Sequence, residues 1–346
     1  MKSIRLLGII LAIQVILIVF MHLGGDELAT YVANQPLMAF NDKIVDRIVI
    51  EEKEKSPLII AKGENGWLLP ENHDFPIEKT KLDGILNSIN QIKRPYAVGN
   101  TELAAKKLRV ASDDFEKKVV FYQKEQPVGS LFMGTSPVYK KVHVRVNEEA
   151  EIFEVPFDSY ALNADKSNWQ DNAYLHLDKE SIAKLSLNGF VLERKEGAAF
   201  AVSKLSENES TRSDKANELL EKVSNISFSD VIGKEPKPEH KDYQEVLSYT
   251  VGLKSEKTRE YKFRAKDKEA TDYVLKISDD PYYFEVKKYV VEDLEKAKRE
   301  DLIEVKAALQ QTEIQEQAIT TTQTEKKAEE EAATTAEIVE SKVTEN

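Results

Sequence analysis

The chain has 346 residues, which is enough for two domains of ordinary size or one large one. Its formal net charge of −12 argues against binding to nucleic acid, which requires clustered positive charge, and the densest basic stretch, Lys106 to Arg109, is short. No cysteine is present. This excludes disulfide bonds, thiolate catalysis, cysteine-based zinc sites and the acylated cysteine of a lipoprotein anchor.

The first residues of the chain predict a membrane-spanning helix. Lys2 and Arg5 precede an apolar run over residues 6–21, about the length that crosses the hydrocarbon core of a bilayer. Lysine and arginine favour the cytoplasmic side of a membrane. We therefore expect residues 1–23 to be a single-pass anchor that contacts the membrane through residues 4–23, with the amino terminus in the cytoplasm and the body outside it.

A cleaved signal peptide is the alternative for this segment. A signal peptide normally has a shorter apolar core, followed directly by a small-x-small cleavage site. Cleavage after Ala29 or Ala33 would place Glu27 or Tyr31 where a small residue is required. The retained anchor is therefore the favoured reading, and residues 24–43 are expected to connect it to the body.

Two stretches of the body carry the same helical stripe, 134 residues apart. The apolar positions of the stripe are Leu82, Ile85, Leu86, Ile89 and Ile92 in the first stretch, and Ala216, Leu219, Leu220, Val223 and Ile226 in the second. This spacing places the side chains on one face of an amphipathic helix. We therefore predict two packed helices, whose buried residues include Ile85, Leu86 and Ile89 in the first and Leu219, Leu220 and Val223 in the second.

Similar strands precede both predicted helices. In each half a first strand is followed by two apolar runs that flank turn residues, which is the signal of a β-hairpin. The strands cover residues 48–50, 58–60 and 67–69 in the first half, with a turn at 63–66, and residues 185–187, 190–192 and 200–202 in the second, with a turn at 195–197. The matching order indicates an internal repeat.

Further strands follow each predicted helix. Valines at 142, 144 and 146 alternate with His143 and Arg145, the period of a strand with one solvated face, and residues 261–264 and 273–277 alternate in the same way. A run of strands without intervening helices favours antiparallel pairing. We expect an α+β fold of two similar lobes at 44–180 and 181–305, each with antiparallel strands and one packed helix, behind an N-terminal transmembrane helix.

The composition changes at the carboxyl end. Residues 306–346 contain no aromatic residue, glycine or proline, and their nine acids and four bases leave a charge of −5. Such a segment buries too little apolar surface to offset chain entropy, so we expect a disordered acidic tail. Good helix formers over residues 291–309 predict a helix that leads out of the last strand.

Residues that commonly carry catalysis are scattered. The histidines, His22, His73, His143, His176 and His240, show no metal-ligand spacing, and no nucleophile elbow, phosphate-binding loop or dinucleotide motif occurs. The acid pair Asp279-Asp280 falls in a predicted turn, where acids are usually solvated. Trp67 and Trp169 are expected in the core. We therefore expect no enzyme activity, no catalytic residue, no metal site and no cofactor, and leave any small-molecule ligand open.

Short motifs along the body resemble one known family. They are Gly66-Trp67-Leu68-Leu69, Val128-Gly129, Tyr139, Val142-His143-Val144-Arg145, Asn168-Trp169-Gln170-Asp171, Ile182 and Leu185-Ser186-Leu187. In this order, over roughly residues 44 to 300, they resemble an uncharacterised bacterial family, domain of unknown function 4340. The acidic tail is not part of the family pattern.

The resemblance implies an amino-terminal helix in the bacterial cell membrane, an extracytoplasmic body and no known catalytic residues. Genes of such proteins often accompany those of ABC transporters of the gliding-motility type. The implied function is a non-enzymatic accessory or partner-binding protein with a membrane-protein partner. Two alternatives stay open: an envelope hydrolase acting on glycan, which needs two carboxyl groups about 5–10 Å apart, and a cell-wall scaffold that uses the acidic tail.

Overall fold

The computed structural model describes residue 14 and residues 34–38, 41–194, 198–267 and 269–305. Apart from residue 14, the predicted anchor lies outside these residues, as do the acidic tail, the turn at 195–197 and most of the connector. Within the described part of the chain, no helix combines the length and apolar character needed to cross a bilayer. The chain divides into two compact units between Gln170 and Asp171, called unit 1 and unit 2 below.

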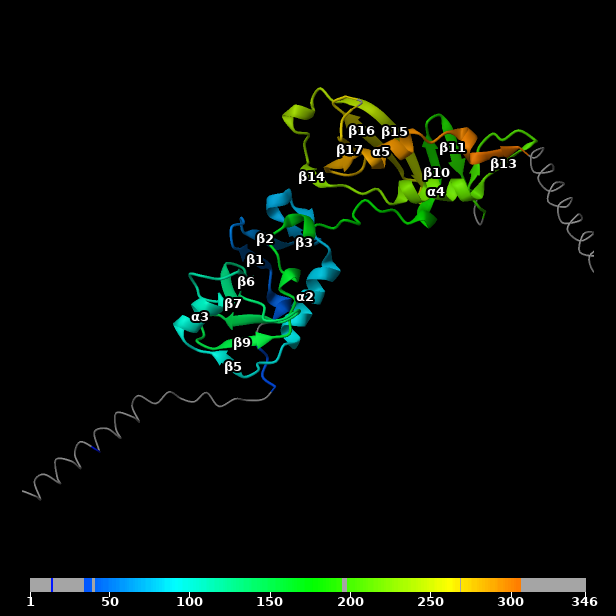
Figure 1. Ribbon diagram of the computed structural model, residues 1–346. Coiled ribbons are helices and arrows are strands. Elements are labelled where there is room, and N and C mark those ends of the chain that lie inside the picture. The colour runs from blue at the N-terminus through cyan, green and yellow to red at the C-terminus, as the bar shows by residue number, and fades with distance from the viewer. Residues whose placement is uncertain (1–13, 15–33, 39–40, 195–197, 268, 306–346) are drawn as a thin grey trace, which may run out of the picture. The chain divides into compact units, whose positions relative to one another are not determined.

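Unit 1 is built on a nine-stranded antiparallel sheet with the order β4-β3-β2-β1-β6-β7-β8-β9-β5 (Figure 1). The strands are β1 (Arg47–Glu52), β2 (Leu58–Gly63), β3 (Gly66–Leu69), β4 (Phe75–Pro76), β5 (Ala97–Gly99), β6 (Lys117–Gln123), β7 (Gln126–Met133), β8 (Val142–Val146) and β9 (Ile152–Val155). Its helices are α2 (Lys79–Gln91) and α3 (Glu102–Leu108).

Helix α2 packs on one face of this sheet. Its stripe of Leu82, Ile85, Leu86 and Ile89 is buried in one hydrophobic cluster with residues of the strands, which confirms the predicted burial. Trp169 belongs to the same cluster and is fully buried, with its indole Nε1 donating a hydrogen bond to the carbonyl of Asn163 at 2.8 Å. The large core of unit 1 therefore lies between the sheet and α2.

The opposite face of the sheet carries a second, smaller core. Phe132 and Ile152 alternate with residues of the α2 side and pack instead with Ala105 and Val110 from the α3 segment. The expected solvated face of β8 is therefore wrong, because Arg145 is only 6% exposed. The α3 segment covers the guanidinium, which donates to the carbonyl of Val110 at 2.7 Å and lies 4.3 Å from the centroid of the Phe132 ring.

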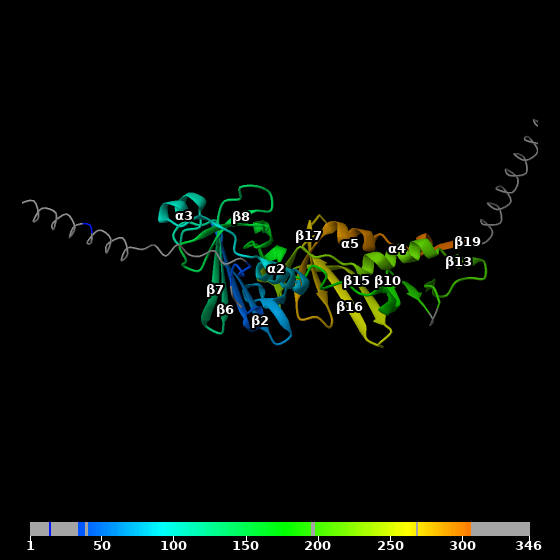
Figure 2. The same ribbon diagram turned by 90° about the horizontal axis from the view of Figure 1, so that it is seen from below.

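Unit 2 contains an eight-stranded antiparallel sheet with the order β12-β11-β10-β15-β16-β17-β18-β14. Its strands are β10 (Ile182–Leu187), β11 (Phe190–Glu193), β12 (Ala201–Val202), β14 (Asp230–Gly233), β15 (Gln244–Leu253), β16 (Thr258–Ala265), β17 (Asp272–Ile277) and β18 (Tyr283–Lys287). Strands β13 (Glu209–Thr211) and β19 (Ile303–Val305) form a separate pair. Helices α4 (Ser213–Ser224) and α5 (Lys288–Glu295) lie next to each other over one face of the large sheet (Figure 2).

The two large sheets share one strand order. Matching β1, β2 and β3 with β10, β11 and β12, β6 to β9 with β15 to β18, and β5 with β14 gives the same sequence of neighbours in both units, apart from the additional edge strand β4. The helix that follows the third strand, α2 or α4, buries its stripe in both, and Leu219, Leu220 and Val223 are buried as predicted. Each unit is thus α+β with antiparallel strands, as the sequence predicts.

Each unit also contains a second α-helix, α3 or α5, where one packed helix was expected. The helix predicted over residues 291–309 is shorter than expected, because α5 ends at Glu295 and residues 303–305 form β19. The side-chain amide of Asn188 donates hydrogen bonds to the carbonyls of Leu294 and Ala297 at 2.9 and 3.0 Å. It thereby satisfies carbonyl groups that a continuing helix would bond.

Candidate functional site

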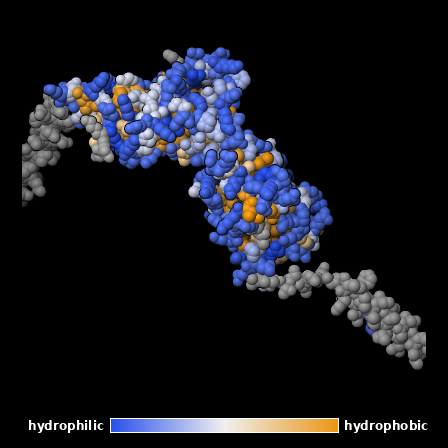
Figure 3. Space-filling model, turned by 180° about the vertical axis from the view of Figure 1, so that it is seen from behind, coloured by the Kyte–Doolittle hydropathy of each residue, from blue (hydrophilic) through white to orange (hydrophobic). Residues whose placement is uncertain are grey.

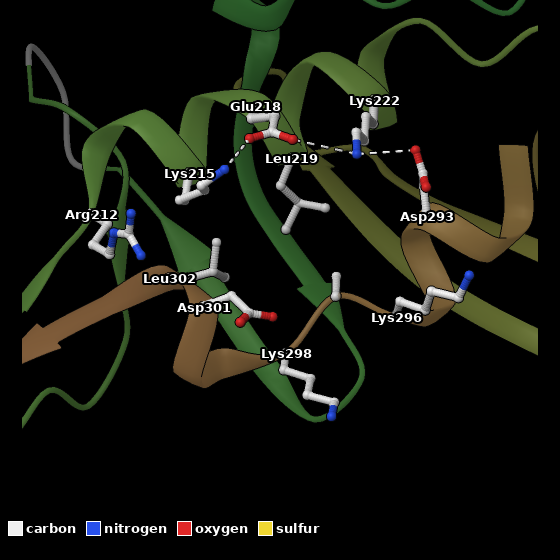
Figure 4. A pocket seen from close by; sticks show the side chains of 11 residues that line it. Arg212, Lys215, Glu218, Leu219, Lys222, Asp293, Lys296, Lys298, Asp301 and Leu302 are labelled. Atoms are coloured by element: carbon white, nitrogen blue, oxygen red, sulfur yellow. Dashed lines mark hydrogen bonds and ion pairs between the residues drawn. The ribbon is translucent and has the colours of Figure 1, made fainter. Parts of the chain in front are cut away.

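A groove of about 330 Å³ lies between α4, the end of α5 and the 3₁₀ helix Arg299–Leu302, and is called the α4–α5 groove below (Figure 4). Its lining residues are Arg212, Lys215, Glu218, Leu219, Lys222, Asp293, Lys296, Ala297, Lys298, Asp301 and Leu302. Its volume is at the lower end of the range for small-ligand sites. The groove can therefore hold a few side chains of a partner rather than a large cofactor.

The sequence of α4 places a charged face on one side of the groove. Because the apolar stripe of α4 turns toward the sheet, Lys215, Glu218 and Lys222 remain at the surface along the groove, with Lys222 next to α5 (Figure 4). The backbone N–H of Arg212 donates to the carbonyl of Leu302 at 2.9 Å, so the start of α4 is tied to the end of the 3₁₀ helix. Both sides of the groove are thereby fixed to each other.

Ion pairs run along the α4 side of the groove. The Lys215 ammonium lies 2.7 Å from Glu218, Glu218 lies 3.5 Å from Lys222, and Lys222 lies 3.1 Å from Asp293 (Figure 4). The hydrogen bond from Lys215 lowers the pKa of Glu218, and the one to Asp293 raises the pKa of Lys222. Each of these four charged side chains is paired with one of opposite charge, so none of them is an isolated acid or base.

The charged side chains on the other side of the groove form fewer ion pairs. Lys298 and Asp301 have no ion-pair partner within 4.0 Å among the described residues, and the side chains of Leu219 and Leu302, which are 5% and 4% exposed, lie between the two sides. The lining contains five basic and three acidic residues, in a chain whose formal net charge is −12. This combination suits a polypeptide segment that presents a carboxylate next to an apolar side chain.

Arg299 holds the 3₁₀ helix of the groove against β13. Its Nη2 and Nη1 atoms bind the carboxylate of Glu209 at 2.7 and 3.2 Å, a two-pronged geometry that fixes both groups. The hydrogen bonds from Arg299 lower the pKa of Glu209 from its ordinary 4.5 to about 2.

This pair predicts an acid-dependent loss of stability. Because the folded pKa of Glu209 is lowered, its contribution is present above pH 4.5 and is lost as the pH falls from 4.5 toward 2. We expect Glu209→Gln to unfold more readily than the natural protein at pH 7, and the difference to vanish near pH 2. Thermal unfolding at several pH values measures it. Glu193→Gln, at the exposed end of β11, is the control and should leave the difference near zero throughout.

A second cluster of polar groups lies at the end of the unit 2 sheet. The expectation that Asp279 and Asp280 are both solvated is wrong, because Asp280 is 6% exposed. It accepts a hydrogen bond from the backbone N–H of Tyr282 at 2.8 Å, and the Tyr174 hydroxyl is also bonded to it. Burial raises the pKa of Asp280, and the same burial raises that of Tyr174. The cluster holds the segment around Tyr174 onto unit 2.

Other residues considered from the sequence take structural positions. His143 is half-buried on β8, with its Nδ1 atom 2.9 Å from the carbonyl of Thr135. Trp67 is half-buried against the large core of unit 1. Among the described residues, no three His, Asp or Glu side chains lie close enough together to hold a metal ion. The sequence predicts no site residue and gives no indication of the α4–α5 groove.

Comparison with known families decides where the chain belongs. The model of the family described as "Domain of unknown function (DUF4340)" matches residues 67–246, which is more than half of the chain. The chain is a member of the DUF4340 family. The resemblance seen in the sequence motifs is thereby confirmed.

The DUF4340 match runs from β3 in unit 1 to β15 in unit 2, so it spans parts of both units. It includes α4 but ends before α5 and the 3₁₀ helix that complete the groove. Comparisons with curated proteins and with solved structures gave no match.

Proposed function

We propose that this DUF4340 protein is a membrane-anchored extracytoplasmic protein without enzymatic activity, which binds a partner in the same membrane. The apolar run at residues 6–21 behind Lys2 and Arg5 supports the anchor. The α4–α5 groove is the observation that supports partner binding, because it places charged side chains that lack an ion-pair partner among the described residues beside Leu219 and Leu302.

The same proposal includes an internal duplication and the position of the transmembrane helix. The shared strand order and the helix stripes 134 residues apart support two similar lobes derived from one ancestral unit, behind an N-terminal transmembrane helix. Helix α5 follows the last strand of the unit 2 sheet, whereas the described chain after β9 in unit 1 contains 3₁₀ turns and no α-helix. We therefore assign the groove, and with it the binding role, to unit 2.

The proposed partner is an extracytoplasmic segment of an integral membrane protein that carries an acidic and an apolar side chain. The basic excess of the groove favours the acidic residue, and Leu219 and Leu302 favour the apolar one. A common membrane would raise the effective concentration of the two proteins. The family resemblance makes a subunit of an ABC-transporter-type complex the first partner to test.

Detergent purification of the full chain from native membranes tests this function. We expect an integral membrane protein to be retained, and Lys298→Glu to reduce its recovery about tenfold, the effect of a loss of about 1.4 kcal/mol in binding. Lys257→Glu, an exposed lysine in the turn between β15 and β16, is the matched control and should retain the partner.

Recovery of the protein as a monomer after mild crosslinking would refute the partner-binding role. Equal losses with Lys298→Glu and Lys257→Glu would show that the partner binds by net charge and does not use the groove.

A further inference from the structure

One short segment of unit 1 exposes three large side chains that are mainly apolar. Tyr96, Val98 and Leu103, within eight residues of each other, are 72%, 51% and 79% exposed. They flank and include β5, an edge strand that pairs with β9 in the described sheet, and extend into α3. On the face of the molecule drawn in Figure 3, hydrophilic residues predominate and hydrophobic ones gather in small patches. Three exposed apolar residues within eight positions of the chain mark a candidate interaction surface.

The same segment is basic in an acidic protein. Residues 93–107 contain four bases and one acid, a net charge of +3, whereas the whole chain carries −12. The side chains of Lys93, Lys106 and Lys107 are exposed; Lys106 lies 3.1 Å from Glu102 and 3.7 Å from Asp113, and the half-buried Arg94 pairs with Glu149 at 2.9 Å. Among the described residues, Lys93 and Lys107 therefore keep their charge free for a partner of the opposite sign. Lysines beside exposed tyrosine and aliphatic residues are the composition found where proteins meet anionic lipid headgroups.

The segment lies where the chain enters the body from its amino-terminal side. The N–H of Leu37 donates to the carbonyl of Ile92 at 2.8 Å, and the N–H of Arg94 donates to that of Gln35 at 2.8 Å, so residues 35–37 run directly beside the start of the segment. Figure 1 shows these first described residues next to β5. The twelve residues 22–33 separate them from the apolar run, and such a length reaches at most about 40 Å.

We propose that residues 93–107, with β5 and the exposed side of α3, rest on the anionic headgroups of the membrane that holds the anchor. This inference rests on the proposed anchor, because the short connection would bring this surface to the bilayer. The positive charge favours an anionic lipid surface over a protein partner, and Tyr96, Val98 and Leu103 can then enter the interfacial region. The groove of unit 2 is not involved.

The absence of cysteine allows a single label to be placed on this surface. The full chain with Leu103→Cys carries an environment-sensitive dye and is reconstituted into phosphatidylcholine vesicles, with or without phosphatidylglycerol, that contain a quencher-labelled lipid. Tyr289→Cys, 67% exposed on α5 of unit 2, is the matched control. We expect the dye at position 103 to be quenched when phosphatidylglycerol is present, and the dye at position 289 to keep its emission.

Adding Lys106→Glu and Lys107→Glu to the Leu103→Cys protein should remove most of the quenching, because two of the three exposed lysines are reversed in charge. Unquenched dye at position 103 in protein that floats with the vesicles would overturn this inference and leave the anchor intact. Protein that does not float with the vesicles would overturn the proposed anchor itself. Equal quenching at positions 103 and 289 would overturn the proposed membrane contact of residues 93–107. So would a shielded dye at position 103 in native membranes that stays unquenched in the vesicles, because this result would assign the surface to a protein partner.

Discussion

Replacing Leu220 by alanine is expected to lower the free energy of unfolding by about 2–5 kcal/mol. Leu220 is 1% exposed in the middle of the α4 stripe, so truncation would leave a cavity beneath the helix. Leu86, at the equivalent position of α2, is also buried and should show a loss of the same size. Denaturant titration measures both effects.

The two variants can be followed by different signals. Both tryptophans, Trp67 and Trp169, lie in unit 1, so their fluorescence reports Leu86→Ala, whereas circular dichroism is needed for Leu220→Ala. Leu103→Ala is the control, because this leucine is exposed on α3 and its loss should cost less than about 0.5 kcal/mol. A loss below about 1 kcal/mol at Leu220 would contradict the packing of α4 on the sheet.

Replacing Arg145 by alanine should lower the free energy of unfolding of unit 1 by about 1.5–3 kcal/mol, the range for the loss of hydrogen bonds from a charged group. The guanidinium donates to the carbonyls of Val110 and Asn147 at 2.7 and 3.2 Å and to the hydroxyl of Ser112 at 2.8 Å. Without it the buried carbonyl of Val110 would lose its partner. Arg145→Lys keeps the charge but not the planar set of donors, so it should recover only part of the loss.

Arg264→Ala is the matched control for Arg145→Ala. Arg264 also alternates with apolar residues along a strand, but its side chain is exposed on β16. Its removal should change the free energy of unfolding by less than about 0.5 kcal/mol. Equal effects of the two substitutions would show that the α3 segment does not cover β8 in solution.

These two arginines show how far the sequence predicts the fold. The local period of β8 and β16 is the same, and it correctly predicts a strand in both. What differs is whether a distant segment covers the outer face: the α3 segment covers Arg145. Periodicity reports the local backbone, and it contains no information on which remote element packs against a given face.

The sequence does not predict the α4–α5 groove for the same reason. Lys215, Glu218 and Lys222 are spaced as an ordinary solvated helix face, and only the fold brings Lys298 and Asp301 opposite them. The helix predicted over 291–309 is too long, because α5 is capped by the side-chain amide of Asn188, more than 100 residues away in the sequence. A local pattern of helix formers does not indicate such a cap. The sequence identifies the turn at Asp280 and therefore predicts a solvated carboxyl group. It does not indicate that the hydroxyl of Tyr174, from a distant segment, bonds to this carboxyl group.

Membrane sidedness tests the proposed anchored, extracytoplasmic protein most directly. The absence of natural cysteine makes Ser3→Cys and Tyr289→Cys the sole reactive thiols in two variants of the full chain. A membrane-impermeant maleimide is added to intact bacterial spheroplasts and, separately, after lysis. We predict that Tyr289→Cys reacts in intact spheroplasts, that Ser3→Cys reacts only after lysis, and that both proteins stay with the membrane in high salt. Reaction of Tyr289→Cys only after lysis would contradict the account.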